Sequence, residues 1–226
     1  AKGAGMIHPR LATTLCFVMT DAAVEPRRLD AILRAGVAES FNAITVDGDT
    51  STNDTVLLLA SGASGAEVRA KSAGEARLAT AVREILAELA RMIVADGEGA
   101  SKVVRLTVRG ARSRSDADRA ARAVANSVLV KTAFGGADPN WGRIACAVGY
   151  SGAAVRPERM EVRIGGVRVA RGDAPAGKAA ERRARRVMKG REFAVDVDLG
   201  LGRHEASVLT CDLGVEYVRF NSEYSS

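Results

Sequence analysis

Apolar residues recur at intervals of three and four along several segments, which is the spacing of an amphipathic helix. The clearest stripe runs through residues 74–95, with arginine and glutamate on the opposite face. A second helix is predicted to start with Ser115 or Asp116 as its N-cap and to turn Val128 and Leu129 inward. The helices predicted in this way cover residues 26–41, 74–95, 115–129 and 176–188.

Shorter apolar runs with β-branched residues lie between these helices and predict strands. The predicted strands cover residues 14–19, 55–59, 103–108, 144–148, 160–169, 193–199, 205–211 and 215–220. Helices and strands alternate at first, and strands gather towards the end. This order favours a layered α/β or α+β domain in which helices pack on sheets.

Composition indicates a globular protein. The chain has 226 residues, 47% of them apolar, which suffices for one large domain or two small ones. No stretch approaches the roughly 18 to 20 uninterrupted apolar residues of a membrane-spanning helix, so no membrane partner is expected. The first residue is not methionine and no secretory signal follows it. We therefore expect the chain to begin inside a longer reading frame or to have been processed.

The net charge of +6 raises the question of nucleic-acid binding. Arginine is spread along the chain, however, and the one dense run, residues 181–186, is typical of a solvated helix face. Only 4% of residues are aromatic, which leaves few platforms for stacking bases. We expect no nucleic-acid partner.

Cysteine and histidine are scarce. Cys16, Cys146 and Cys211 form no CxxC pair and are odd in number, so neither a zinc site nor a disulfide framework is indicated, and a reducing cytoplasm is expected. His8 and His204 are the only histidines, so few residues could serve as the base of a Ser-His-Asp catalytic triad.

Residues 2–15, KGAGMIHPRLATTL, place two glycines and a proline ahead of Ala12 and Thr13, and an apolar strand follows. A tight loop of this kind can bring the Thr13 hydroxyl to the Ala12 carbonyl. A threonine at a chain start needs no histidine, because its α-amino group, with a pKa of about 7.7 to 8.0, can act as the base. By itself the segment fits an ordinary turn equally well.

Residues 2–15 resemble the cleavage motif of the bifunctional glutamate/ornithine acetyltransferase family of arginine biosynthesis. Three further stretches resemble the same family in the same order. They are residues 45–55 (TVDGDTSTNDT), 96–102 (DGEGASK) and 131–143, which end in DPNWGR. The final residues, NSEYSS, are also similar to the end of that family. The motifs are long and follow the family order from the first residue to the last.

The resemblance implies a fold like that of the N-terminal-nucleophile hydrolases and self-cleavage between Ala12 and Thr13. Residues 1–12 would end an α chain and residues 13–226 would form a β chain that stays associated with it, in an assembly of two α and two β chains. Thr13 is implied as the nucleophile. The substrate-binding positions implied by the resemblance are Lys2, Thr13, Glu98, Asn221 and Ser226.

The sequence departs from the family at three of these motif positions. Ser226 stands where threonine is usual, Leu11 where methionine is usual and Arg10 where asparagine is common. In addition, the family's α chain carries a Thr-Gly pair that forms the oxyanion hole, and the 226 residues include only the last part of that chain. Loss of one oxyanion donor can cost about 3 to 4 kcal/mol, so low activity is expected from this chain alone.

The implied reaction is a double displacement in which Thr13 takes acetyl from N-acetylornithine and passes it to glutamate. No cofactor is expected, and acetyl-CoA is a second candidate acetyl donor. Lys2 is expected to meet a substrate carboxylate, and Glu98 a substrate amino group or the proton of the nucleophile. Asn221 and Ser226 are expected to meet polar groups of the amino acid. Two alternatives are a related self-processing aminopeptidase or amidohydrolase and an inactive fragment that lacks its α chain.

Some motif residues also have simpler structural explanations. Residues 47–53 loosely imitate a calcium loop, but Thr52 replaces its glycine and Leu58 its bidentate glutamate, so side-chain to backbone turns are expected there. Trp141 and Arg143 are expected to brace the core and a loop. Without the family resemblance, Glu98 would read as a solvated turn residue.

Overall fold

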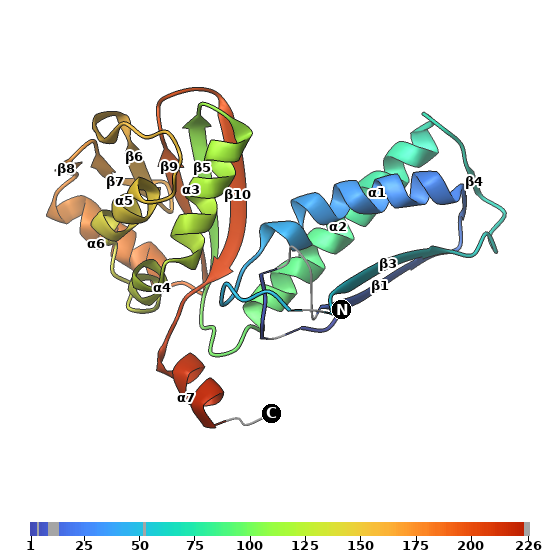
Figure 1. The fold of residues 1–226 in the computed structure, drawn as a ribbon, viewed down its shortest axis with the longest axis horizontal. Coiled ribbons are helices and arrows are strands. Elements are labelled where there is room, and N and C mark those ends of the chain that lie inside the picture. Colours follow the sequence, from blue (N-terminus) through green and yellow to red (C-terminus); the bar gives the residue numbers. More distant parts are fainter. Residues whose placement is uncertain (4, 9–13, 52, 224–226) are drawn as a thin grey trace. The chain divides into compact units, whose positions relative to one another are not determined.

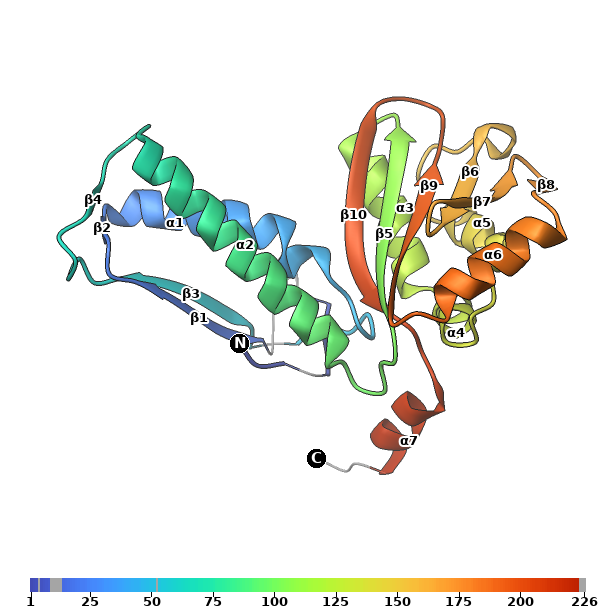
Figure 2. The same cartoon turned by 180° about the vertical axis from the view of Figure 1, so that it is seen from behind.

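The computed structural model describes residues 1–3, 5–8, 14–51 and 53–223. The chain divides into two compact units, unit 1 (Ala1–Asp96) and unit 2 (Gly97–Ser226). Figures 1 and 2 show the elements of each unit from opposite sides. None of the helices in the described ranges combines the length and apolar character needed to cross a membrane.

Unit 1 places two helices on one side of a two-stranded parallel sheet (Figures 1 and 2). The sheet pairs β1 (Leu15–Thr20) with β3 (Thr55–Ala60). A shorter parallel pair joins β2 (Ala23–Val24) to β4 (Glu67–Val68). The helices are α1 (Pro26–Glu39) and α2 (Ala73–Ala95), and a short 3-10 helix (Phe41–Ala43) follows α1.

The two helices of unit 1 approach closely at Gly36. A Cβ atom at this position would lie only 2.8 Å from Leu86 Cδ1, and Leu86 and Val82 of α2 are buried. Ser72 caps α2 by accepting a hydrogen bond from the Glu75 N–H over 3.1 Å. The apolar stripe predicted along residues 74–95 therefore contacts α1, and both predicted helices are confirmed.

The sheet of unit 1 has one covered and one open face. Side chains alternate along β1, so Cys16 and Val18 are buried while Phe17 and Met19 are 50% and 75% exposed. The parallel register places exposed residues of β3 beside those of β1. The residues that form this apolar sheet face are Leu15, Phe17, Met19, Leu57 and Leu59.

Unit 2 contains a six-stranded mixed sheet with the order β10-β5-β9-β6-β7-β8. β5 and β9 run parallel, and the other neighbours are antiparallel. The strands are β5 (Val103–Ala111), β6 (Glu161–Ile164), β7 (Val167–Arg171), β8 (Ala174–Pro175), β9 (Glu192–Asp198) and β10 (His204–Cys211). Val104, Leu106 and Val108 of β5 are fully buried, which makes this strand the centre of the core.

Helices cover this sheet. α3 (Arg114–Asn126) packs on β5 and β10, and its face of small residues, with Ala117, Ala120 and Ala121 fully buried, allows close contact. α6 (Lys178–Met188) packs on β6, β7 and β9. α4 (Val128–Gly135), α5 (Trp141–Gly149) and the final helix α7 (Val215–Glu223) complete the unit. The mixed α/β architecture predicted from the sequence is confirmed.

Two predicted strands, residues 144–148 and 215–220, are wrong, because these residues lie in α5 and α7. Asn140 accepts a hydrogen bond from the Arg143 N–H over 3.2 Å and starts α5. A short apolar run fits a buried helix as well as a strand, so the cap decides between them. In α7 the apolar residues Val215 and Val218 are exposed rather than packed in a sheet.

The helix predicted from residue 115 ends earlier than expected. Ser113, not Ser115 or Asp116, caps α3 by accepting from the Asp116 N–H over 3.0 Å. The helix stops at Asn126 and Ser127 caps a new helix, α4. This break turns Val128 and Leu129 outward, where they are 61% and 59% exposed, so their predicted burial is wrong.

The predicted strand at residues 160–169 is a hairpin of two strands, β6 and β7. Gly165 and Gly166 form its turn with φ angles of +55° and +76°, which glycine adopts readily. A Cβ at Gly165 would lie 2.4 Å from Val187 Cγ1 of α6. The close contact with α6 thus also requires glycine at this turn.

Candidate functional site

The candidate residues fall into three groups. Ala12, Thr13 and Ser226 lie outside the described residues, so the nucleophile, the cleavage bond and the last substrate contact stay predictions. Lys2 lies in unit 1, close in the chain to the predicted cleavage bond. Glu98 and Asn221 lie in unit 2, and the structure brings these two together.

Lys2 lies beside the strand that follows Thr13. Its N–H donates to the Leu15 carbonyl over 2.9 Å, and the Leu15 N–H donates to the Lys2 carbonyl over 3.0 Å. This antiparallel bridge fixes the Lys2 backbone opposite the first residue of β1. The Lys2 side chain is exposed, so its ammonium is available to an anionic group.

Asp47 holds the segment ahead of the predicted cleavage bond. Its carboxylate accepts the N–H groups of Met6 over 2.7 Å and Ile7 over 3.0 Å. The Val46 N–H also donates to the Ile7 carbonyl over 2.7 Å. The same carboxylate accepts the Asp49 N–H over 3.0 Å, which confirms the turn predicted in place of a calcium loop.

Asp54 holds the segment just after the predicted cleavage bond. Its carboxylate accepts the N–H of Thr14, which is the residue next to Thr13. The Thr14 carbonyl in turn accepts the Thr55 N–H over 2.7 Å. Burial raises the pKa of the Asp54 carboxyl, while the hydrogen bonding to Thr14 lowers it. The bond to Thr14 thus offsets part of the cost of burying this charge.

Glu98 and Asn221 form the polar pair of unit 2. Asn221 Nδ2 donates to Glu98 Oε2 over 3.0 Å and also to the Tyr217 carbonyl over 3.0 Å. Glu98 belongs to a loop before β5, and Asn221 belongs to α7, 123 residues later in the chain. A specific partner for Glu98 argues against a merely solvated turn residue.

Gly99 makes this pair possible. Its φ angle is +67°, and a Cβ atom there would lie 2.4 Å from the Tyr217 nitrogen in α7. Only a residue without a side chain allows the loop to approach the helix backbone so closely. The glycine therefore sets the distance between the loop that carries Glu98 and the helix that carries Asn221.

Asp212 anchors the other end of the Glu98 loop. This buried carboxylate accepts the N–H groups of Ser101 and Lys102, each over 2.8 Å, and the Ser101 hydroxyl over 2.5 Å. On the other side of the same strand end, the buried Lys131 donates from Nζ to the Cys211 carbonyl over 2.5 Å. The chain on both sides of β10's last residue is thereby fixed.

The sequence analysis missed the roles of Asp47, Asp54 and Asp212. Two of them lie within the motif at residues 45–55, so the motif itself was the available signal. No sequence signal pointed to Asp212, because its hydrogen-bond partners are about 110 positions away in the chain. Arg143 braces a helix rather than the predicted loop, since its guanidinium donates to the Leu129 carbonyl of α4 over 2.8 Å. Trp141 packs against the core as predicted.

Metal binding finds no support in the part of the chain that the structure describes. No group of three or more His, Cys, Asp or Glu side chains lies close enough there to hold a metal ion. The described polar groups instead offer an exposed lysine, a carboxylate and a carboxamide. The lysine belongs to unit 1 and suits a carboxylate, whereas the carboxylate and carboxamide belong to unit 2 and suit an amino group.

Comparisons with known proteins identify relatives over the whole chain. The model of the ArgJ family matches residues 1–226. The arginine biosynthesis bifunctional protein ArgJ of Geobacter sulfurreducens is 56% identical over 225 residues, which cover 99% of this chain and 57% of that protein. The mitochondrial protein of the same name from Schizosaccharomyces japonicus is 48% identical over 241 residues, which cover 100% of this chain and 53% of that protein.

A solved structure is similar as well. The crystal structure of arginine biosynthesis bifunctional protein ArgJ from Bacillus halodurans matches with a TM-score of 0.88 and 38% sequence identity. The match covers 94% of this chain and 100% of that chain. The chain thus spans little more than half the length of these curated relatives, but all of the matched crystal chain.

The first prediction concerns the glycine between the Glu98 loop and α7. Gly99→Ala should push the helix away from the loop, because the added Cβ has no room beside Tyr217. We expect amides of residues 215–223 to exchange hydrogen about tenfold faster or more, which corresponds to about 1.4 kcal/mol of lost local stability. Hydrogen exchange followed by mass spectrometry measures this.

Gly214→Ala is the matched control. A Cβ at Gly214 meets no atom within 4 Å, so this variant should leave exchange in α7 nearly unchanged. Equal protection of α7 in the Gly99 variant and in the unmodified protein would show that the contact does not hold the helix.

Proposed function

Because the chain belongs to the ArgJ family, we propose that it carries the nucleophile of a self-cleaving acetyltransferase. In this proposal Thr13 moves an acetyl group from N-acetylornithine to glutamate in arginine biosynthesis. The main support is that the family match runs through residues 1–226 and so includes the Ala12–Thr13 bond. The described backbone on both sides of that bond is held by carboxylates of one motif, Asp47 and Asp54.

The self-cleavage begins with the Thr13 hydroxyl. Its oxygen attacks the Ala12 carbonyl carbon, the C–N bond breaks, and the Thr13 nitrogen takes up the proton to become a free amine. The resulting ester is hydrolysed by water, which leaves a carboxylate on Ala12 and a free hydroxyl on Thr13. Attack requires a fixed geometry, and the bonds to Met6, Ile7 and Thr14 restrict the chain on either side of the reacting atoms.

Acetyl transfer then uses the same hydroxyl. The α-amine of Thr13 accepts the hydroxyl proton, and the oxygen attacks the acetyl carbonyl of N-acetylornithine. The amide C–N bond breaks, ornithine leaves with the proton, and an acetyl ester remains on Thr13. The amine of glutamate attacks this ester, which restores the hydroxyl and releases N-acetylglutamate. The scheme consumes no cofactor, and acetyl-CoA would serve as a second donor at the same step.

Recognition of the amino acid falls to the polar groups. The exposed Lys2 ammonium suits a substrate carboxylate, and the Glu98 carboxylate suits a substrate amino group or the proton of the nucleophile. Asn221 Nδ2 donates to Glu98, so the carboxamide fixes the direction of that carboxylate. Ser226 would add a hydroxyl to the same set.

The sheet of unit 1 supports a second chain as partner. Parallel sheets are normally covered on both faces, and an isolated two-stranded sheet is barely stable in water. Here the face with Phe17 and Met19 is open. We propose that the remaining portion of the protein, the α chain, covers this face, and that two α and two β chains assemble together. That portion would also supply the oxyanion hole.

Thr13→Ala should abolish both self-cleavage and acetyl transfer, because alanine has no oxygen to accept either acyl group. Electrophoresis of the precursor measures cleavage, and formation of N-acetylglutamate measures transfer. Thr14→Ala is the control, and it should still cleave, because the Asp54 bond uses the Thr14 backbone N–H. Cleavage of the Thr13 variant at the unchanged bond, with loss in the Thr14 variant, would transfer the nucleophile to Thr14.

Glu98→Gln should lower kcat/KM for transfer by about a hundredfold or more, if the carboxylate handles a proton in the reaction. The change preserves size, so the free energy of unfolding measured in urea should stay within about 0.5 kcal/mol of that of the parent protein. Glu216→Gln, at an exposed position of α7, is the matched control and should keep full activity. Unchanged kinetic constants in the Glu98 variant would remove Glu98 from the site.

Supplying the α chain should raise activity and protect β1 and β3 from hydrogen exchange. Phe17→Asp should weaken this association, because it places a charge on the open apolar sheet face. Tyr150→Asp is the control, since Tyr150 is similarly exposed at 62% but lies in unit 2. Native mass spectrometry measures the association. Full turnover by the isolated chain, with no gain from the α chain, would contradict this part of the proposal.

A further inference from the structure

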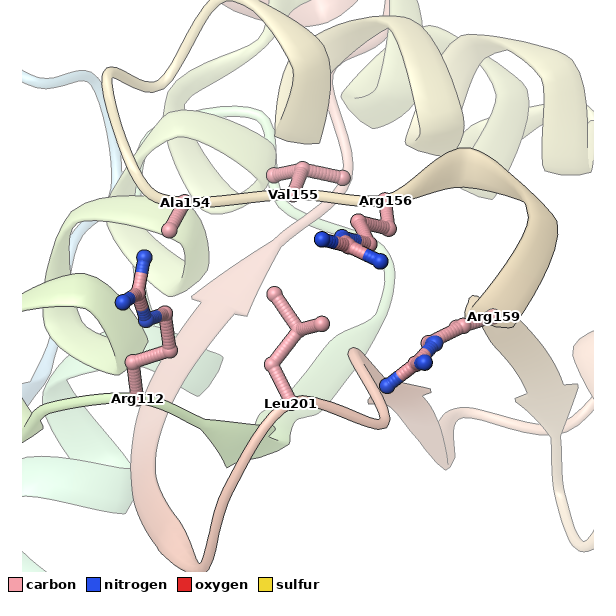
Figure 3. A pocket seen from close by; sticks show the side chains of 6 residues that line it. All are labelled: Arg112, Ala154, Val155, Arg156, Arg159 and Leu201. Carbon is pink, nitrogen blue, oxygen red and sulfur yellow. The ribbon is translucent and has the colours of Figure 1, made fainter.

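Unit 2 contains a pocket that the proposed reaction does not use. Its volume is about 400 Å³, within the range of about 300 to 1,000 Å³ that is usual for small-molecule sites. The lining residues are Arg112, Ala154, Val155, Arg156, Arg159 and Leu201. Figure 3 shows the three guanidinium groups arranged around one hollow, with Leu201 between them.

The three pocket arginines, Arg112, Arg156 and Arg159, come from separate parts of the fold. Arg112 directly follows β5, whereas Arg156 precedes and Arg159 ends a short 3-10 helix (Pro157–Arg159) before β6. Some arginines of this sheet do have an acidic partner, as Arg109 pairs with Asp198 and Arg163 with Glu161. Within the described ranges, no acidic side chain lies within ion-pair distance of any pocket arginine.

Two acidic residues, Asp116 and Glu158, adjoin pocket residues in space or in the chain. Asp116 accepts the N–H of Ala154 in the pocket wall and pairs with Arg119, which holds the pKa of its carboxyl below the usual range. Glu158 lies between two pocket arginines in the chain, but it is not within ion-pair distance of either of them. The hollow therefore carries three positive charges without a built-in counter-ion.

The walls of the pocket are fixed by backbone contacts. The N–H groups of Leu201 and Gly202 both donate to the Gly110 carbonyl, over 2.7 and 2.8 Å. A Cβ at Gly202 would lie 2.3 Å from the Ala111 carbonyl oxygen, and one at Gly200 would lie 3.2 Å from that of Arg159. The turn with Leu201 is thus in direct contact with the segments that carry Arg112 and Arg159, so the backbone of the pocket walls is held by contacts within the protein.

We propose that this pocket binds a small molecule with two linked phosphate groups and a flat aromatic base, the chemistry of a nucleoside diphosphate. Guanidinium groups bind phosphate oxygens in pairs of parallel hydrogen bonds. Three positive charges match a diphosphate, which carries about three negative charges at neutral pH. Leu201, Val155 and Ala154 provide apolar contact for the ring.

The pocket lined by Arg112, Arg156 and Arg159 is distinct from the Glu98–Asn221 pair. Glu98 precedes β5 and Arg112 follows it, and this strand of nine residues spans about 30 Å at roughly 3.3 Å per residue. A ligand in the pocket would therefore not touch either member of the pair. The inference stands whether or not the chain transfers acetyl groups.

Isothermal titration calorimetry of the complete protein with ADP, pyrophosphate, adenosine and citrate tests the pocket. ADP should bind most tightly, because it offers both the phosphates and the base. Pyrophosphate and citrate should bind more weakly than ADP, and adenosine, which has no phosphate, should not bind measurably. The affinity for ADP should fall as the salt concentration rises. Arg156→Ala and Arg159→Ala should each weaken ADP about tenfold, because each removes a charge-assisted contact. These side chains are exposed, so folding is preserved, and circular dichroism checks it.

Arg182→Ala is the matched control, because Arg182 is an exposed arginine of α6 outside the pocket. Its ADP affinity should stay within about twofold of the parent protein. Absence of ADP binding would overturn the proposal. So would adenosine or citrate binding as tightly as ADP, or equal losses of affinity in the pocket variants and in the control.

Discussion

Carboxylates that accept backbone N–H groups hold the segments that adjoin the candidate residues in each unit. Asp47 holds the segment before the predicted cleavage bond, Asp54 holds the residue after the predicted nucleophile, and Asp212 holds the end of the Glu98 loop. Such segments lie outside the sheet ladders, so their N–H groups need other partners. Hydrogen bonds to a charged acceptor contribute about 1.5 to 3 kcal/mol each, roughly twice a neutral bond. The loops are therefore fixed without regular secondary structure.

This arrangement suits a site that must be in position before any substrate arrives. A reacting group held loosely by about 1 Å can lose on the order of a hundredfold in rate. Glycine contributes the complementary constraint, because Gly99 lets the loop touch the α7 backbone where any side chain would clash. Carboxylate anchors and close glycine contacts together define where Glu98 lies relative to Asn221, although neither residue belongs to a strand of the sheet.

Most of the fold could be predicted from the sequence, because a long segment with a regular apolar spacing fits only one type of secondary structure. Residues 74–95 form one helix as expected, and β5 begins at the predicted Val103. Short apolar runs failed, as at residues 144–148, because five apolar residues suit either a strand or a buried helix turn. A single polar cap at Asn140 decided that outcome. Glu98 and Asn221 came from family resemblance, and their hydrogen bond across 123 positions could not be read from spacing.

The positions of charged residues along the chain also did not predict which of them lie together in the fold. Arginine spread evenly along a chain argues against a nucleic-acid surface, which needs an extended run of positive charge. Even spacing in sequence does not exclude a small cluster in space, however. β5 ends beside the turn between β9 and β10, and that turn touches the segment before β6, so three arginines from separated segments line one cavity. The sheet order creates this convergence, and it produces a compact cationic hollow suited to a small anion rather than a surface suited to a polymer.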